Sequence, residues 1–190
     1  MRWQGPDEGK EGRGRGRTVA GGQKEGQRAR EEMKFVLDPA LGKLTKWLRI
    51  LGHDAIYWRG DQKGLMKLAE RENRVIITKT RKILQESQGR LTVFFVTENN
   101  PFLQLKEVIE GLKLKVKPED LFSRCLICNE KLISIPPEAV RGRVPDYVYR
   151  TQGSFSECPK CRRVFWGGTH YERMMEDLRR AIGEDNGGEF

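Results

Sequence analysis

Between residues 34 and 112 the sequence alternates four times between a short apolar run and a longer amphipathic segment, and no other feature constrains the fold as strongly. The apolar runs are rich in β-branched and aromatic residues, which predicts strands at 34–38, 54–58, 74–79 and 91–96. The intervening segments repeat apolar residues at helical spacing, which predicts helices at 39–52, 64–73, 80–87 and 100–112. Near-continuous apolar strands that alternate with helices favour an α/β fold, with a parallel sheet covered by helices on both faces.

Carboxylates lie at or shortly after the ends of three of the predicted strands. They are Asp38, Asp61 and Glu98, in chain order. Ligands of open parallel sheets bind outside the carboxyl ends of the strands, and carboxylates placed there could hold Mg²⁺ or Mn²⁺. Such an ion would activate water and stabilise a phosphoryl transition state. Asp38 also has a structural alternative, because an Asp before Pro at a helix start is often only a helix cap.

All four cysteines fall in two Cys-x-x-Cys pairs, CLIC (125–128) and CPKC (158–161). Each pair can present two thiolates from one tight turn, and two pairs complete the four-cysteine shell that structural zinc prefers. We therefore predict a zinc ribbon with one structural zinc per chain, held by Cys125, Cys128, Cys158 and Cys161. The redox alternative requires a pair that opens a helix in a thioredoxin-like unit, and neither pair does so.

Charge and composition predict the kind of partner, the cellular location and the segments that lack a hydrophobic core. The formal net charge is +9, which favours a polyanionic partner. No stretch of 18 apolar residues and no apolar leader occurs, so we expect a cytoplasmic protein without a membrane partner. Residues 1–33 are rich in Gly and charge without apolar periodicity, and 184–190 are similar, so we predict disorder in both.

Six stretches resemble the PIN-like ribonuclease family known as the Mut-seven C-terminal RNase domain: FVLDPALGKLTKWLRILGHDAIY, RVIITKTRKIL, NPFLQL, FSRCLICNEKL, VPDYVY and CPKCRRVFWGGTHYERM. Together they cover about residues 34–176, in the family's order. The resemblance implies a PIN-like domain at 34–118, then a zinc ribbon with a C-terminal helix at 119–183. It also implies cleavage of RNA that depends on Mg²⁺ or Mn²⁺.

The resemblance places the catalytic site on Asp38, with Asp61 and Glu98 completing the metal shell and Thr80 acting directly or through water. Related sequences usually carry Asp at the position of Thr80, and their acidic position in the second helix falls on Gln62, one residue after Asp61. A hydroxyl is a weak, neutral metal ligand beside a carboxylate. We therefore expect weak metal binding and slow or absent cleavage.

Basic residues cluster near the same sheet edge and near the second cysteine pair, as a phosphate-binding surface requires. The candidates for RNA binding are Lys43, Lys46 and Arg49, which we expect on the first helix opposite its apolar face, together with Lys79, Arg81, Arg162 and Arg163. The alternative for each cluster is an ordinary solvated helix face.

Two hypotheses follow from different classes of function. The first is a metal-dependent ribonuclease, which Asp38 favours. The second is a catalytically inactive module of the same fold that binds RNA or a protein, which Thr80 and Gln62 favour.

Overall fold

The computed structural model of the chain describes residues 33–87 and 89–182. Apart from Met33, the two segments for which the sequence predicts disorder lie outside these residues. Among the described residues, no helix has the length and apolar character needed to cross a membrane.

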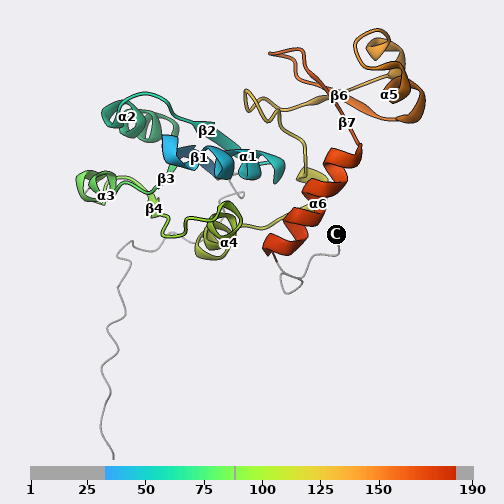
Figure 1. Ribbon diagram of the computed structural model, residues 1–190. Helices are drawn as coiled ribbons and strands as arrows, with labels where there is room; N and C mark the ends of the chain where they lie inside the picture. The colour runs from blue at the N-terminus through green and yellow to red at the C-terminus, as the bar shows by residue number, and fades with distance from the viewer. Residues whose placement is uncertain (1–32, 88, 183–190) are drawn as a thin grey trace, which may run out of the picture. The chain divides into compact units, whose positions relative to one another are not determined.

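A four-stranded parallel sheet forms the centre of the first half of the chain (Figure 1). Its strands are β1 (Lys34–Leu37), β2 (Asp54–Tyr57), β3 (Val75–Thr78) and β4 (Val93–Phe95), in the spatial order β2-β1-β3-β4. The predicted α/β class with a parallel sheet is thereby confirmed. The strand order reverses between β1 and β3, so the ligand-binding edge expected for such sheets lies at the carboxyl ends of these two strands.

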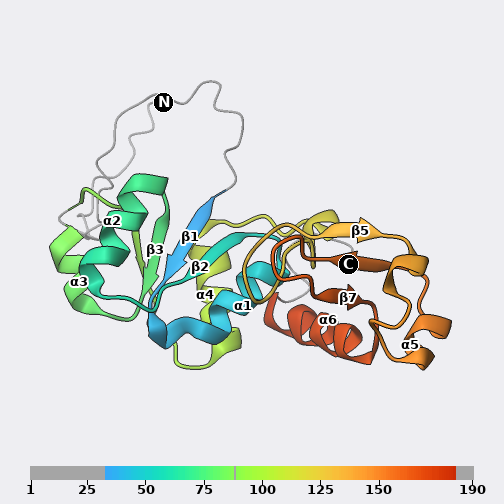
Figure 2. The same cartoon turned by 90° about the horizontal axis from the view of Figure 1, so that it is seen from above.

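Helices cover both faces of the sheet because alternate residues of each strand point to opposite faces. On one face, Phe35 and Leu37 are buried with α1 (Gly42–Ile50) and α4 (Pro101–Leu112). On the other face, Val36 is buried with α2 (Gln62–Glu72) and α3 (Arg81–Ser87), and Figure 2 shows these two helices together on one side of the sheet. A short 3₁₀ turn, η1 (Pro39–Leu41), joins β1 to α1.

A second module follows the short turn η2 (Pro118–Asp120). It contains the antiparallel sheet β5 (Ile133–Ile135), β6 (Phe155–Glu157) and β7 (Val164–Trp166), in that spatial order. The long insertion between β5 and β6 holds the turn η3 (Pro137–Val140) and the helix α5 (Asp146–Thr151). A separate buried cluster of Val140, Val144, Val148 and Phe155 forms the core of this module.

The last helix, α6 (Thr169–Ile182), packs against α4. Leu178 is buried in the same cluster as the α1 and α4 side chains, and Met175 packs beside it. The domain boundaries predicted from the sequence group this helix with the zinc ribbon, and the structure shows that Met175 and Leu178 also pack against the core of the α/β half. The reason is that apolar residues three positions apart on α6 align on the side that meets α4.

Candidate functional site

Asp38 lies at the carboxyl end of β1 and is buried, with 3% of its surface exposed. One carboxylate oxygen, Oδ1, accepts the backbone N–H of Ala40 at 2.9 Å and so caps η1. The other, Oδ2, accepts the Thr78 hydroxyl at 2.5 Å and the Lys79 N–H at 2.9 Å. The chain thus uses Asp38 both as the cap and as a bridge between β1 and β3, the two strands at the reversal in strand order.

Thr80 stands next to Asp38. Its hydroxyl Oγ1 lies 3.4 Å from Asp38 Oδ2, and its N–H donates to the Thr78 hydroxyl at 2.9 Å. The Thr80 side chain is exposed, so a longer or charged group would fit there.

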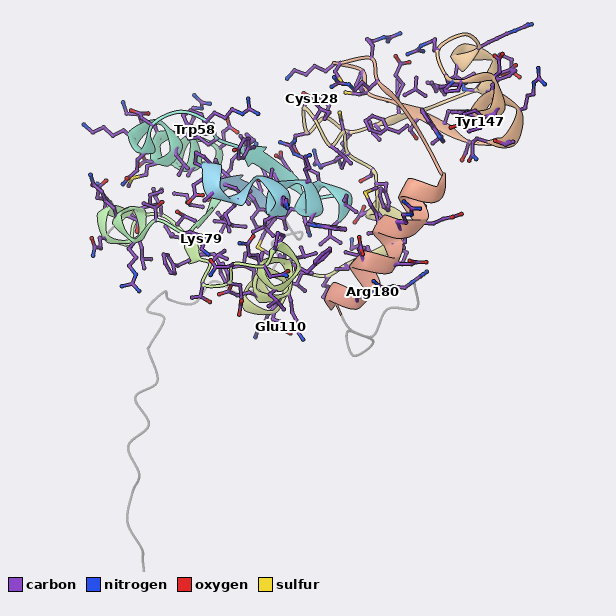
Figure 3. The ribbon with its side chains drawn as sticks, viewed as in Figure 1. Trp58, Lys79, Glu110, Cys128, Tyr147 and Arg180 are labelled. Carbon is purple, nitrogen blue, oxygen red and sulfur yellow. The ribbon has the colours of Figure 1, made fainter. Side chains whose placement is uncertain are left out.

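Lys79 joins the ends of β3 and β4. Its side chain, labelled in Figure 3, donates from Nζ to the Glu98 carbonyl oxygen at 2.7 Å and to Asn99 Oδ1 at 2.5 Å. The Asn99 amide and a main-chain carbonyl thus hold an ammonium group one residue away from Thr80. The Lys79 ammonium group therefore places a positive charge at the carboxyl ends of β3 and β4.

Glu107 on α4 organises the loop after β4, and the sequence analysis missed it. Its carboxylate accepts the N–H and the hydroxyl of Thr97 and the N–H of Glu98, at 2.7–3.1 Å. Burial raises the pKa of Glu107, but these hydrogen bonds and the nearby Lys79 outweigh burial, so its pKa is lowered. A Glu in the middle of a helix carries no sequence signal for this role.

Asp61 caps α2, accepting the Gly64 N–H at 2.9 Å, and its carbonyl oxygen accepts the Trp58 indole N–H at 2.7 Å. Gln62, the next residue, donates from its side-chain amide to Glu86 Oε2 of α3 at 2.7 Å. Both side chains therefore make local contacts that stabilise the α2–α3 face.

The predicted carboxylate triad is not assembled. Within residues 33–87 and 89–182, the four cysteines are the one group of three or more His, Cys, Asp or Glu side chains close enough to share a metal ion. Asp61 is used as a helix cap, and Glu98 lies on a loop held by Glu107. The buried carboxylate at the sheet edge is Asp38, whose two oxygens already accept three hydrogen bonds. This donor set does not fit a divalent cation, which requires several oxygen ligands.

The four cysteine sulfurs all lie within 4.8 Å of one another. Sγ of Cys125 lies 3.6 Å from that of Cys161, and Sγ of Cys128 lies 3.3 Å from that of Cys158. Tetrahedral zinc with bonds of about 2.3 Å separates its sulfur ligands by about 3.8 Å, so the cluster could hold a metal ion and is consistent with zinc. Burial raises the pKa of Cys128 to about 12, and the N–H of Arg163 helps to lower that of Cys161 to about 7. A bound cation would remove this difference between the pKa values of the thiols, because a coordinated thiol is deprotonated.

The two cysteine turns have the same backbone geometry. In each, the fifth residue lies in the left-handed region, Asn129 at φ 70° and Arg162 at φ 61°. The first cysteine of each turn donates its N–H to the residue five positions later, from Cys125 to Glu130 and from Cys158 to Arg163, at 2.8 and 3.0 Å. This repeated turn is the knuckle geometry that the Cys-x-x-Cys spacing predicts.

Arg49 fixes the first knuckle to the sheet. Its guanidinium donates to the carbonyl oxygens of Ala55 at 2.8 Å, of Leu126 at 2.8 Å and of Ile127 at 3.0 Å. The side chain of Asn129 adds a second connection, accepting from the Ala55 N–H and donating to Asp54. The knuckle therefore covers the open edge of β2, an edge that would otherwise expose unpaired backbone groups.

Arg49 corrects one expectation from the sequence. It is 6% exposed and bound to three carbonyl oxygens, so it does not share the solvent face of Lys43 and Lys46. Six residues turn a helix by about 600°, which leaves Arg49 about 120° away from Lys43 around the helix axis. Arg49 is therefore not a candidate for RNA binding.

The other predicted basic residues remain accessible. Lys43, Lys46, Arg81 and Arg163 are exposed, and Lys79 is half-buried in the contacts described above. Arg162 is exposed too, although its Nε pairs with Glu157 at 2.8 Å.

Comparison with known proteins gives one match. The family model described as the Mut7-C RNAse domain matches residues 33–178, which is well over half of the chain and includes the sheet, the knuckles and most of α6. No curated protein and no solved structure matches the chain. The matched family is the one that the sequence motifs indicate, and its description suggests a nuclease-like role on RNA.

Proposed function

The chain belongs to the Mut7-C RNAse domain family, and from this membership we propose that it binds RNA at the carboxyl ends of β1 and β3 and cleaves it slowly or not at all. The observation that carries the proposal is the state of Asp38. Its two oxygens accept hydrogen bonds from Ala40, Thr78 and Lys79, and the neighbouring family position is the neutral Thr80. The proposed function is thus RNA recognition by a ribonuclease-type domain.

Charge supports the RNA partner. Lys43 and Lys46 are exposed on α1, which follows Asp38, and Arg81 is exposed on α3, which follows Thr80. Phosphate groups bound by these side chains would release counterions, and this release makes binding favourable and dependent on salt. Lys79 would add an ammonium group next to Thr80, where the family places a second carboxylate.

Metal-dependent cleavage is the second candidate, and the buried Asp38 carboxylate at the carboxyl end of β1 favours it. A divalent ion requires anionic oxygens to offset its dehydration, and Thr80 supplies none. Mg²⁺ or Mn²⁺ at Asp38 would also have to displace the Thr78 hydroxyl or the Lys79 N–H from Oδ2. An added carboxylate at position 80 would lie beside Asp38 and provide the missing negative charge.

We also propose that the cysteine cluster holds one structural zinc. The ligands would be Cys125, Cys128, Cys158 and Cys161, and a closed four-cysteine shell leaves no open position for catalysis. When bound, the metal supplies a cross-link between the two knuckles. The module has a small core of its own, so its stability would depend on this cross-link.

The test compares the natural chain with Thr80→Asp, and with Thr80→Asn as the control of equal size without charge. Binding of labelled single-stranded RNA is measured by fluorescence anisotropy, cleavage in Mn²⁺ on denaturing gels, and Mn²⁺ affinity by calorimetry. We expect RNA binding by all three proteins, and stronger Mn²⁺ binding and faster cleavage only in Thr80→Asp. Adding Asp38→Asn to that variant should abolish both gains.

Two results would contradict the proposal. If the natural chain does not bind RNA at moderate salt, then RNA recognition is wrong. If the natural chain cleaves rapidly and Thr80→Asp changes nothing, then a site built from other residues performs the cleavage.

A further inference from the structure

A cavity of about 650 Å³ opens beside the ribbon sheet, where β6, β7, α5, the first turns of α6 and the segment 121–132 meet. Its volume falls within the range of about 300–1,000 Å³ that is usual for ligand sites. The lining residues include none of the four cysteines and none of the residues around Asp38. The cavity is therefore separate from both sites described above.

Five aromatic side chains are among the residues that line the cavity. They come from four different segments and are Phe122, Tyr147, Phe165, Trp166 and Tyr171. Although all are large and largely apolar, Tyr147 is 69% exposed, Trp166 38% and Tyr171 37%. Figure 3 labels Tyr147 on α5. Large exposed aromatic groups gathered at one cavity indicate a binding surface, because solvent exposure of such groups is otherwise unfavourable.

Phe122, in the cavity wall, has an unfavourable backbone conformation. Its φ is 55°, in the left-handed region that bulky residues rarely adopt, and its N–H donates to the Ile50 carbonyl oxygen at 2.7 Å. The ring lies against Tyr171, with centroids 4.3 Å apart and planes tilted by 43°. Strained positions of this kind cluster at ligand sites, where the surrounding structure enforces them.

The polar groups of the cavity suit the edge of a nucleobase. Gln152 contributes an amide, and Ser154 and Ser156 contribute hydroxyls. An amide offers a donor and an acceptor side by side, which is the pairing that base edges present. Arg150 is exposed on α5 at three positions from Tyr147, so it lies on the same helix face and can meet a phosphate next to a bound base.

We propose that this cavity binds an unstacked nucleobase of single-stranded nucleic acid against its exposed aromatic side chains. The proposal rests on the proposed function, RNA binding, and adds a second contact region on the ribbon. Single-stranded RNA is recognised in this way elsewhere, because every base has a π-face that stacks on aromatic rings. The cavity recognises bases, whereas the exposed lysines of α1 contact only phosphates.

The experiment compares Trp166→Ala and Trp166→Phe with the natural full chain, and uses Leu103→Ala on α4 as a control for loss of an exposed apolar group. The probes are a labelled single-stranded RNA of about 12 nucleotides and an abasic oligomer of the same length. Trp166→Ala should weaken RNA binding by about 5- to 100-fold, as expected for loss of one base–aromatic stack. Trp166→Phe and Leu103→Ala should bind almost normally. The dependence on salt should not change, since no phosphate contact is lost.

Binding of the abasic oligomer should be weak in the natural chain and unaffected by Trp166→Ala. If Trp166→Ala binds RNA normally while removal of Lys43 and Lys46 weakens binding, then the cavity proposal is wrong and RNA binding stands. If the natural chain binds no RNA, the proposed function fails. Quenching of Trp166 fluorescence by a nucleoside monophosphate, measured against Trp166→Phe, then decides the cavity alone. Quenching by an aromatic peptide and not by the nucleotide would also overturn the inference.

Discussion

Arg49→Met should strongly destabilise the protein without changing how it binds RNA. Methionine preserves most of the aliphatic side chain and removes the guanidinium, so three carbonyl oxygens lose their donor: those of Ala55, Leu126 and Ile127. A hydrogen bond from a charged group contributes about 1.5–3 kcal/mol. The bond to Ala55 is buried and the other two are only partly buried, so we count about two full bonds and expect a loss of about 3–6 kcal/mol.

The assay is urea unfolding followed by circular dichroism, with Lys46→Met as the matched control. Lys46 is an exposed cation on the same helix, so its loss should change the free energy of unfolding by less than about 0.5 kcal/mol. For a chain of this size, the loss at Arg49 corresponds to a fall of about 10 °C in the thermal midpoint. Hydrogen exchange should rise first in β2 and in residues 125–129, which Arg49 holds together.

A small effect of Arg49→Met on stability, together with a flatter dependence of RNA affinity on salt, would refute this reasoning. Arg49 would then act as a phosphate contact, as the helix pattern predicts, and its buried contacts would not form in solution.

Three further predictions concern the knuckles, the basic face of α1 and the response to pH. Cys128→Ser, or zinc removal with a chelator, should unfold β5–β7 while the parallel sheet stays protected from hydrogen exchange, because the two modules have separate buried clusters. Simultaneous loss of protection in both sheets would show a shared core. Neutralising Lys43 and Lys46 together should flatten the slope of log RNA affinity against log salt by about 1.5 units, and an unchanged slope would return them to an ordinary solvated face. Burial raises the pKa of Asp54, but hydrogen bonds from Arg74 and Asn129 outweigh burial, so the pKa of Asp54 is lowered in the folded protein. The ionised Asp54 therefore stabilises the fold above about pH 4, and this stabilisation is lost as pH falls through the folded pKa. Asp54→Asn should flatten stability against pH below about 4, and an unaltered profile would show that other carboxylates control acid unfolding.

Much of the architecture could be predicted because it rests on local patterns. Apolar runs and helical spacing are properties of neighbouring residues, and they correctly placed the four parallel strands and the four helices around them. The cysteine spacing gave the repeated knuckle for the same reason, because each turn is closed within six residues. Asp38 could be located at the sheet edge, since a strand end followed by Pro is visible in the sequence.

The candidate site was less predictable because it depends on partners that are distant in sequence. Asp38 receives Thr78 and Lys79 from β3, and Glu107 reaches back ten residues from α4 to hold Thr97. A sequence pattern shows that carboxylates follow strands but does not show whether their oxygens are free.

The amino-acid sequence by itself determined the fold class, the knuckles and the family, because these follow from periodicity, spacing and motif order. Only the tertiary structure decided that Arg49 is a buried link between α1 and the first knuckle, that Leu178 of α6 packs in the α/β core, and that aromatic side chains from four segments line one cavity. The physical reason is the same in each case. Burial and hydrogen bonding of a side chain depend on which distant segment packs against it. The residues next to a charged or aromatic side chain in the sequence do not identify that segment.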